Sequence, residues 1–302
     1  MKLSQIEYKG WNCLRLFNDE IELVVTLDVG PRVIRCAFLN GPNFFKEYEE
    51  TLGLKGGEKW NIFGGHRLWH APENIPRTYF PDNFPVQFEE IEGGAKFIQE
   101  VETTTDIQKE IEIRVDAKEA RVEVLHRLTN RNIWDVELAP WSPTVMDVGG
   151  TTIVPLPPRG THPEDLLPTS SLIVWAFTDM SDARWAWGKK YVLLRQDESA
   201  IKPQKIGVHV PDGWTAYVNK NQMFLKTFDY IEGADYPDMG SVVETFTNNE
   251  MIELETLGPL VLLEPDESVQ HIENWHLFGD VSTPVSDADV DANVFPKVKS
   301  VL

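Results

Sequence analysis

Residues 110–115 read Glu-Ile-Glu-Ile-Arg-Val, and this strict alternation of charged and apolar side chains decides the fold class. Successive side chains of a β-strand point to opposite faces, so the apolar residues of this stretch share one buried face. The same period of two returns at residues 121–128, where Val122, Val124 and Leu128 share a face that the charged residues avoid. Both stretches predict β-strands with one buried face.

Short alternating or apolar runs continue along the whole chain, for example at residues 21–29, 206–210 and 269–278. Turn sequences such as Asn40-Gly41-Pro42 and Asp212-Gly213 separate these runs. No amphipathic helix longer than about two turns is visible in the pattern. About fifteen expected strands and few helices predict an all-β protein, a large antiparallel β-sandwich.

No linker divides the chain, so we expect residues 1–302 to form a single domain. Residues 154–167 contain three closely spaced prolines and predict a long surface loop, and residues 61–85 form a second irregular region. From about residue 282 the chain is acidic and rich in turn residues. This composition predicts an exposed, acidic C-terminal tail.

The charge balance excludes several classes of partner. The chain has 28 basic and 48 acidic residues, a formal net charge of −20. Such a surface repels phosphate backbones and anionic lipids, so we expect neither nucleic acid nor a membrane as a partner.

Cys13 and Cys36 do not form a disulfide framework, no signal peptide is recognisable, and no apolar run has the length of a membrane span. We therefore expect a cytoplasmic protein and make no prediction of its oligomeric state.

Three glutamates near the C-terminal end of the chain form the first candidate site. A two-residue hairpin turn at Asn248-Asn249 places Glu244, Glu253 and Glu255 on one face of two paired strands, with Glu244 opposite Glu253. Opposed like charges destabilise a sheet, and apolar neighbours raise the pKa of a carboxyl group. A carboxyl group tuned in this way suits a general base or a shared-proton acid. The alternative is that this face of the two strands is exposed to solvent.

Residues 63–73, Phe-Gly-Gly-His-Arg-Leu-Trp-His-Ala-Pro-Glu, form the second candidate site. Planar hydrogen-bond donors and an indole in irregular structure suit a neutral sugar, whose hydroxyls and ring face they contact. The two histidines are four residues apart, but a proline ends any helix there and the metalloprotease glutamate is missing, so we predict no metal. The alternative is a purely structural loop. The candidate ligand-contacting residues are His66, Arg67, Trp69, His70 and Glu73.

Two further residues complete the candidate binding set. Trp141 lies in Ala-Pro-Trp-Ser-Pro at residues 139–143, a rigid setting for an indole that stacks on a sugar. Lys226 lies in a predicted strand, where an inward-pointing ammonium needs a carboxylate or a ligand as its partner. Packing in the core is the alternative for Trp141. His126 alternates with apolar residues, and we interpret it as a core histidine.

Several stretches resemble galactose mutarotase-like (aldose 1-epimerase-like) proteins. Residues 23–45, which contain Val-Gly-Pro-Arg-Val-Ile and Leu-Asn-Gly-Pro-Asn, resemble the first hairpin of that superfamily. Leu-Thr-Asn at residues 128–130 resembles a strand end in the middle of its fold. Ile-Glu-Leu-Glu-Thr at residues 252–256, followed by Pro-Asp-Glu-Ser at 265–268, resembles the late strand that carries its catalytic glutamate. The matching stretches follow the family order over nearly the whole chain.

The resemblance implies a single β-supersandwich with a sugar cleft and an isomerase that interconverts sugar anomers. In that family a glutamate takes the proton of the anomeric hydroxyl, a histidine protonates the ring oxygen, and no cofactor takes part. The motif position implies that Glu255 is the base, with Glu253 and Glu244 as alternatives. It also places His66 and Arg67 near the substrate-binding arginine of the family. The implied partner is a small-molecule carbohydrate.

The sequence departs from the family pattern at two places. Gly65-His66-Arg67 stands where the family has an Asn-Arg pair, and no histidine occurs between His126 and His162, where the acid histidine is expected. The acid role is therefore either vacant or moved to another residue, and His70 is our candidate for it. Two alternatives are a sugar-binding or sensing protein without catalysis and a carboxylate-dependent glycan lyase or hydrolase on the same fold.

Overall fold

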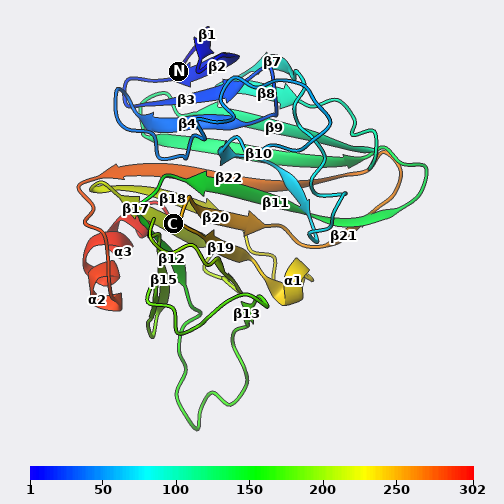
Figure 1. Cartoon of the computed structure of the whole chain (residues 1–302). Helices are drawn as coiled ribbons and strands as arrows, with labels where there is room; N and C mark the ends of the chain where they lie inside the picture. Colours follow the sequence, from blue (N-terminus) through cyan, green and yellow to red (C-terminus); the bar gives the residue numbers. More distant parts are fainter.

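A computed structural model describes all residues, 1–302, and contains two large antiparallel sheets that pack against each other (Figure 1). The first sheet has 12 strands. Its order is β1 (Lys2–Tyr8), β2 (Trp11–Phe17), β3 (Ile21–Thr26), β4 (Val33–Phe38), β5 (Gly65–His66), β11 (Val136–Met146), β20 (Ile252–Leu257), β19 (Val243–Thr247), β16 (Gln204–Val208) and β13 (Leu172–Val174), while β6 (Trp69–Ala71) and β21 (Val261–Leu263) also pair with β11.

The second sheet has 10 strands, and its longest members cross the middle of the molecule in Figure 1. Its order is β14 (Trp185–Trp187), β15 (Tyr191–Arg195), β12 (Thr151–Pro155), β17 (Trp214–Asn219), β18 (Gln222–Phe228), β22 (Ser268–Gly279), β10 (Arg121–Asn130), β9 (Ile107–Val115), β8 (Gly94–Ile98) and β7 (Gln87–Ile91). The all-β sandwich predicted from the alternating pattern is confirmed.

The main core lies between the two sheets. Ile111 and Ile113 of β9 and Val122 and Val124 of β10 are fully buried, whereas the charged residues between them stay partly exposed. They join a continuous apolar cluster of 39 buried residues that also contains residues of the first sheet, such as Leu23. Burial of one strand face from each sheet therefore holds the sandwich together.

The C-terminal segment is not the exposed tail that its composition predicts. It forms α2 (Asp287–Asp289), the π-helical turn η1 (Val290–Val294) and α3 (Phe295–Val298), drawn in red beside β17 in Figure 1. Its valines at 290, 294 and 298 are fully buried against the second sheet, where Trp214 and Leu225 belong to the same apolar cluster. Their spacing of four residues places them on one helical face, and this apolar face outweighs the acidic composition.

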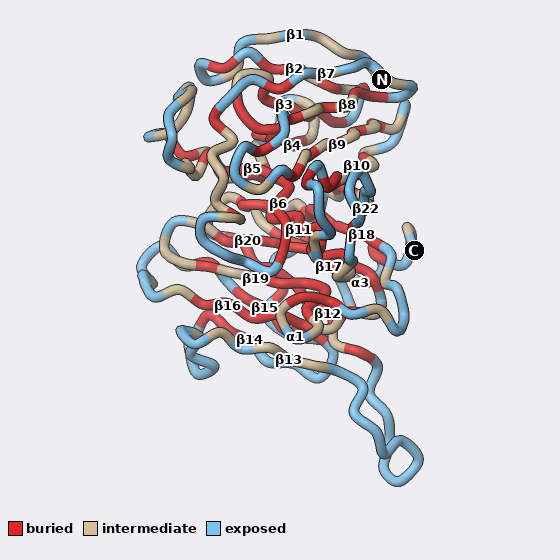
Figure 2. The backbone as a smooth tube through the Cα atoms, turned by 90° about the vertical axis from the view of Figure 1, so that its right-hand side faces the viewer, coloured by how far each residue is buried: buried red, intermediate tan, exposed pale blue.

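The connection between β12 and β13 leaves the body of the sandwich. Residues 158–170 are exposed throughout and form the projecting pale-blue loop of Figure 2. A short four-residue turn, α1 (Pro237–Gly240), lies beside β16, and its Asp238 and Met239 have positive φ. No helix in the structure combines the length and the apolar character needed to span a bilayer.

The hairpin of β19 and β20 has a longer turn than expected. Residues 248–251 connect the strands, because Asn248 Oδ1 accepts hydrogen bonds from the backbone N–H groups of Glu250 and Met251. Glu244 therefore pairs with Glu255, and Glu253 pairs with Phe246. The register differs from the expected one by two residues, so every side chain keeps its predicted face.

Candidate functional site

Strand β20 separates two buried polar groups because its side chains alternate between the faces of the first sheet. Glu253 and Glu255 point to one face, while Leu254 and Thr256 point to the interior between the sheets. Glu244 of the neighbouring strand lies on the same face as Glu255. We call Glu244, Glu253, Glu255 and Lys205 of β16 the carboxylate cluster.

Lys205 joins two of the three glutamates. Its Nζ lies 2.7 Å from Glu244 Oε2 and 3.3 Å from Glu255 Oε2. Glu255 Oε2 also accepts a 2.8 Å hydrogen bond from Trp141 Nε1. The ammonium lies 4.8 Å from the ring centres of both Trp141 and Trp175, which indicates cation–π contact on two sides.

Arg67 holds the third glutamate. Its Nη2 donates to Glu253 Oε1 at 3.1 Å, and its guanidinium lies 4.0 Å from the centre of the Trp69 ring. Trp69 in turn contacts Trp141 at 5.2 Å between ring centres. The carboxylate cluster is therefore bordered by an aromatic wall, whose members are Trp60, Trp69, Tyr79 and Trp141.

Several polar atoms of this face are buried without a hydrogen-bond partner. They are Glu244 Oε1, Glu255 Oε1, Arg67 Nε and Nη1, and Trp60 Nε1. Glu244 and Glu255 are fully buried, and Glu253 is 8% exposed. A buried polar atom without a partner costs about 1–3 kcal/mol, so such atoms gathered at one place indicate a site for a polar ligand.

The buried carboxyl groups differ from ordinary surface ones. Burial raises the pKa of Glu244 to about 8, Lys205 opposes the rise, and Glu255 and Asp238 reinforce it. Burial also raises the pKa of Glu253, against the attraction of Arg67. Burial disfavours the Lys205 ammonium, but the two adjacent glutamates outweigh it, so the pKa of Lys205 lies above its ordinary value. Burial therefore favours the protonated form of Glu244 even beside the Lys205 ammonium.

The polar residues on the opposite side of β20 form a second group, which we call the interior cluster: His66, His126, Lys226, Thr256, His271 and Glu273. The directions of the hydrogen bonds between its histidines can be assigned. The His271 carbonyl can only accept, so His126 Nδ1 donates to it at 2.9 Å and His126 Nε2 is an acceptor. His66 Nε2 therefore donates to His126 Nε2 at 2.7 Å, and His66 Nδ1 accepts from Thr144 Oγ1 at 2.8 Å. Burial lowers the pKa of both imidazoles, which are neutral. The expectation that His126 is a core histidine is confirmed.

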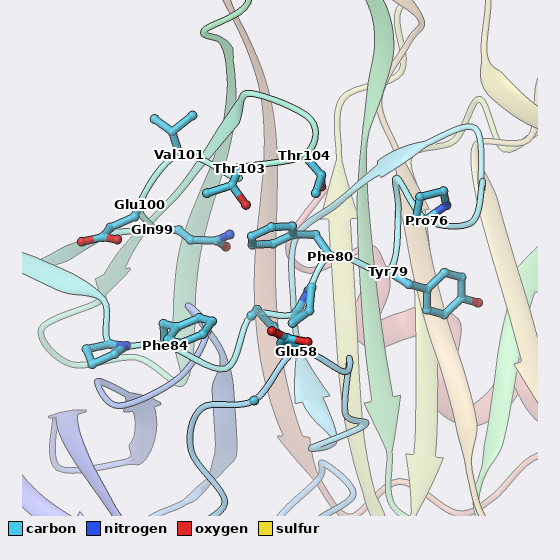
Figure 3. Close-up of a pocket in the computed structure, with 15 residues that line it drawn as sticks. Glu58, Pro76, Tyr79, Phe80, Phe84, Gln99, Glu100, Val101, Thr103 and Thr104 are labelled. Atoms are coloured by element: carbon cyan, nitrogen blue, oxygen red, sulfur yellow. The ribbon is translucent and has the colours of Figure 1, made fainter.

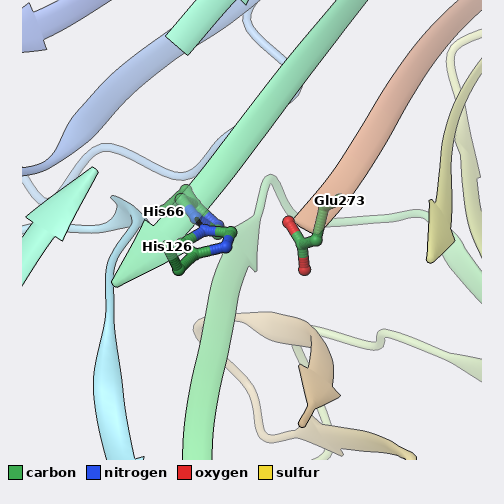
Figure 4. A group of neighbouring side chains, drawn as sticks. All are labelled: His66, His126 and Glu273. Atoms are coloured by element: carbon green, nitrogen blue, oxygen red, sulfur yellow. Dashed lines mark hydrogen bonds between the residues drawn. The ribbon is translucent and has the colours of Figure 1, made fainter. Parts of the chain in front are cut away.

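Glu273 lies beside these imidazoles (Figure 4), and the possible ligand atoms of His66, His126 and Glu273 lie within 4.8 Å of one another. Lys226 Nζ and Thr256 Oγ1 donate to Glu273 Oε1 at 2.7 and 2.5 Å. Trp275 Nε1 donates to Oε2 at 2.7 Å. A metal ion would lie next to the Lys226 ammonium and compete with three existing donors, so these residues do not fit a metal site.

Four residues predicted for the site lie elsewhere or at its edge. His66 and Lys226 belong to the interior cluster. His70 points away from the face of Trp69 and Ala71, toward Glu102 Oε2 at 3.8 Å, so the structure does not bring it to Glu255. Glu73 is exposed and accepts a hydrogen bond from Tyr79. His66 and His70 lie in β5 and β6, where strand alternation sets the direction of their side chains, whereas an irregular loop was expected at residues 65–71.

The structure brings together Arg67, Trp69, Trp141 and the three glutamates, as the sequence predicted for a sugar site. Trp141 is buried, although its proline-flanked setting suggested exposure. Sequence reasoning missed Lys205 and Trp175. Lys205 in Gln-Lys-Ile-Gly-Val could have drawn attention as a lysine in an apolar strand, the signal that selected Lys226.

A cavity of about 620 Å³ lies beside the aromatic wall and is not lined by the carboxylate cluster. Residues 76–85 and 99–104 provide most of its lining, and Figure 3 shows Phe80 and Gln99 facing each other across it. Tyr79 also lines this cavity and contacts Trp69 at 5.0 Å between ring centres. Tyr79 is therefore the residue that the cavity shares with the aromatic wall.

No protein-family model matches the sequence, and a search of curated proteins also found no match. Solved structures do match in fold. The Slr1438 protein from Synechocystis sp. PCC 6803 is 10% identical with a TM-score of 0.58, over 91% of this chain and 99% of that one. A galactose mutarotase related enzyme from Lactobacillus acidophilus is 9% identical with a TM-score of 0.56, over 90% and 99% of the two chains.

A galactose mutarotase-like protein from Lactobacillus casei ATCC 334 matches in the same way, at 10% identity and a TM-score of 0.55, over 88% of this chain and 100% of that one. All three matches extend over most of both chains, so they concern the whole sandwich and not a single motif. The chain therefore has the galactose mutarotase-like fold that its hairpin and late-strand sequences resemble.

Proposed function

We propose that the protein binds a neutral sugar at the carboxylate cluster and interconverts its anomers, with Glu255 as the general base. One observation carries this proposal: Glu244 and Glu255 lie side by side, fully buried, with free carboxyl oxygens among tryptophan rings. The unpartnered oxygens suit sugar hydroxyls, and the indoles suit the apolar face of a pyranose. The fold shared with galactose mutarotase-like proteins supports the same function.

Glu255 is suited to remove the proton of the anomeric hydroxyl. Trp141 Nε1 and Lys205 Nζ both face its Oε2, so this oxygen is held in place. Its Oε1 has no partner and is free to accept the sugar proton. Half-buried Trp175 lies over the Lys205 ammonium, at 4.8 Å from its ring centre.

The test follows the equilibration of pure anomers of several aldoses by polarimetry, with wild type, Glu255→Gln and Glu250→Gln. We expect wild type and Glu250→Gln to accelerate equilibration of at least one aldose. Glu250 is an exposed residue in the turn of the same hairpin. In Glu255→Gln the new amide keeps the size of the carboxyl group but cannot take a proton, so a loss of about 10²–10⁴-fold is expected. No acceleration by wild type, or an unaffected Glu255→Gln variant, contradicts the proposal.

A second candidate function is sugar binding without turnover, and the absence of histidine contacts with the carboxylate cluster favours it. His66, His126 and His271 bind within the interior cluster, and His70 faces Glu102. A binding protein is stabilised by its sugar but does not accelerate equilibration. At a ligand concentration of 100 Kd the stabilisation is about 2.7 kcal/mol, which a thermal-shift experiment detects.

A further inference from the structure

The carboxylate cluster has no histidine contact that could supply the proton donor for anomer interconversion. Ring opening requires one group to remove the anomeric proton and a second group to protonate the ring oxygen. None of the hydrogen bonds or ion pairs of Glu244, Glu253 or Glu255 involves a histidine. Any acid for this reaction must therefore come from another residue type on the same face.

We propose that Glu244 is this acid, so that two carboxyl groups on adjacent strands divide the two proton transfers between them. Glu244 and Glu255 are direct cross-strand partners. Both approach the Lys205 ammonium, so their Oε2 atoms lie no more than about 6 Å apart. The hydroxyl oxygen and the ring oxygen of a cyclic sugar are bonded to the same carbon, so neighbouring carboxyl groups can reach both. This inference rests on the proposed function.

The surroundings of the two carboxyl groups are unequal. Glu255 Oε2 is held by an indole N–H and an ammonium. Glu244 has only the ammonium as a favourable neighbour, and the carboxyl groups of Glu255 and the half-buried Asp238 act against its ionisation. Burial raises the pKa of Glu244 to about 8. Of two neighbouring carboxyl groups, the one whose surroundings favour the protonated form is suited to act as the acid, and here this is Glu244.

The proposed reaction balances without any further reactant. Glu255 takes the proton of the anomeric hydroxyl while Glu244 gives its proton to the ring oxygen, the bond between C1 and the ring oxygen breaks, and C1 becomes an aldehyde. After rotation about the C1–C2 bond, Glu244 takes back the hydroxyl proton as that oxygen attacks the other face of C1. Glu255 returns its proton to the aldehyde oxygen, so the starting state is restored with the other anomer.

Lys205 has a defined role in this exchange. The negative charge moves from Glu255 to Glu244 during ring opening and returns during closure. The Lys205 ammonium contacts both carboxyl groups, at 3.3 and 2.7 Å, so it remains paired with a carboxylate in either state. A fixed charge that is already oriented lowers the cost of moving charge in a buried site. Lys205 is thus a positioning residue for the pair.

The experiment measures the rate of anomer exchange by NMR between pH 5 and 10 for wild type, Glu244→Gln, Glu244→Asp and Glu250→Gln. We expect the wild-type rate to fall above about pH 8, where Glu244 loses its proton. Glu244→Gln should lower kcat by about 10²–10⁴-fold with a smaller change in KM. Glu244→Asp retains a carboxylic acid and should recover part of the rate together with the fall at high pH. Glu250→Gln should keep the wild-type profile.

The outcomes separate this inference from the proposed function. If wild type does not exchange anomers of any aldose, the proposed function fails. If wild type is active and Glu255→Gln is inactive, but Glu244→Gln keeps both its rate and the high-pH limb, the proposed function stands and the assignment of Glu244 is overturned. Thermal unfolding of each variant checks the fold. Should Glu244→Gln not fold, an Asp variant without any high-pH limb overturns the assignment.

Discussion

Lys205 and Lys226 are both buried lysines paired with glutamate, and they differ in how completely their partners are bound. The Lys226 ammonium is held by Glu273 and by the backbone carbonyls of Ser142 and Leu254. Three donors reach Glu273 in turn. In the Lys205 pair, by contrast, Glu244 Oε1 has no hydrogen-bond partner. An ion pair whose polar atoms all have hydrogen-bond partners serves the structure, whereas a pair with an unpartnered carboxyl oxygen can still accept a hydrogen bond from a ligand.

The raised pKa of the Glu244 carboxyl group makes the free energy of unfolding depend on pH. Its pKa is about 8 in the folded protein and about 4.5 in the unfolded chain. Between these values the folded state holds a proton that the unfolded chain has released, so the free energy of unfolding falls as the pH rises from 4.5 to 8. We expect Glu244→Gln to remove this fall. The neighbouring Lys205, Glu255 and Asp238 remain in place.

Urea unfolding of wild type and Glu244→Gln at pH 5 and pH 8.5 measures the effect. The difference between the two proteins should shift in favour of the variant by on the order of 4 kcal/mol from the lower to the higher pH. Glu250→Gln, which changes an exposed carboxyl group, should follow wild type at both pH values. Parallel behaviour of wild type and Glu244→Gln would show that Glu244 is ionised at neutral pH.

Strand alternation predicted the face of the three glutamates, whereas the position of His70 was wrong because its strand was not recognised. Alternation alone placed Glu244, Glu253 and Glu255 on one face, and it did so even though the turn was two residues longer than expected. The sequence predicts His70 beside Trp69 in an irregular loop. In β6 these adjacent residues point to opposite faces. Lys205 is visible as a lysine in an apolar stretch, but its contact with Glu244 is not, because the pairing of β16 with β19 joins residues far apart in the sequence.

At the scale of elements, the C-terminal helices contribute to the core in spite of their acidic sequence. Val290, Val294 and Val298 are fully buried against β17 and β18, and they form one face of the helical segment. Their spacing is visible in the sequence, but the acidic residues between them suggested a solvated tail. The missing information was the apolar surface of the second sheet that these valines cover.

Replacing Val294 by Ala should lower the free energy of unfolding by about 2–3 kcal/mol, because two buried methyl groups are lost and a cavity remains. Asn293→Ala is the matched control, since Asn293 is exposed in the same helical segment. Its effect should stay within about 0.5 kcal/mol. Chemical unfolding of both variants measures the difference. Equal stability of the two would mean that this segment contributes little to the folded state in solution.

At the scale of the whole molecule, sequence patterns predicted the sandwich but not the order of its strands. The first sheet places β5 and β11 next to each other, and β11 next to β20, although long stretches of chain separate them. Period-two alternation is a local property and carries no information about which strands become neighbours. The resemblance of residues 23–45 and 252–256 to a known family supplied the architecture that the alternation could not.

The projecting loop should be cleaved by protease without loss of the fold. Arg159 is exposed and belongs to residues 158–170, which form the projecting loop of Figure 2. We expect limited trypsin treatment to cut first after Arg159. The two fragments should elute together in gel filtration, because β10 pairs with β22 and β11 pairs with β20 across the cut. Arg159→Gln should delay the first cut. Separation of the fragments would contradict this description of the sandwich.

The alternation of β20 has a consequence for how the protein can change during evolution. One residue inserted just before Glu255 would reverse the orientation of everything after it, and a carboxylate would enter the interior next to Glu273. After an insertion of two residues, each following side chain would again point to its original face of the sheet. We therefore expect this strand to tolerate insertions of an even number of residues and not of an odd number.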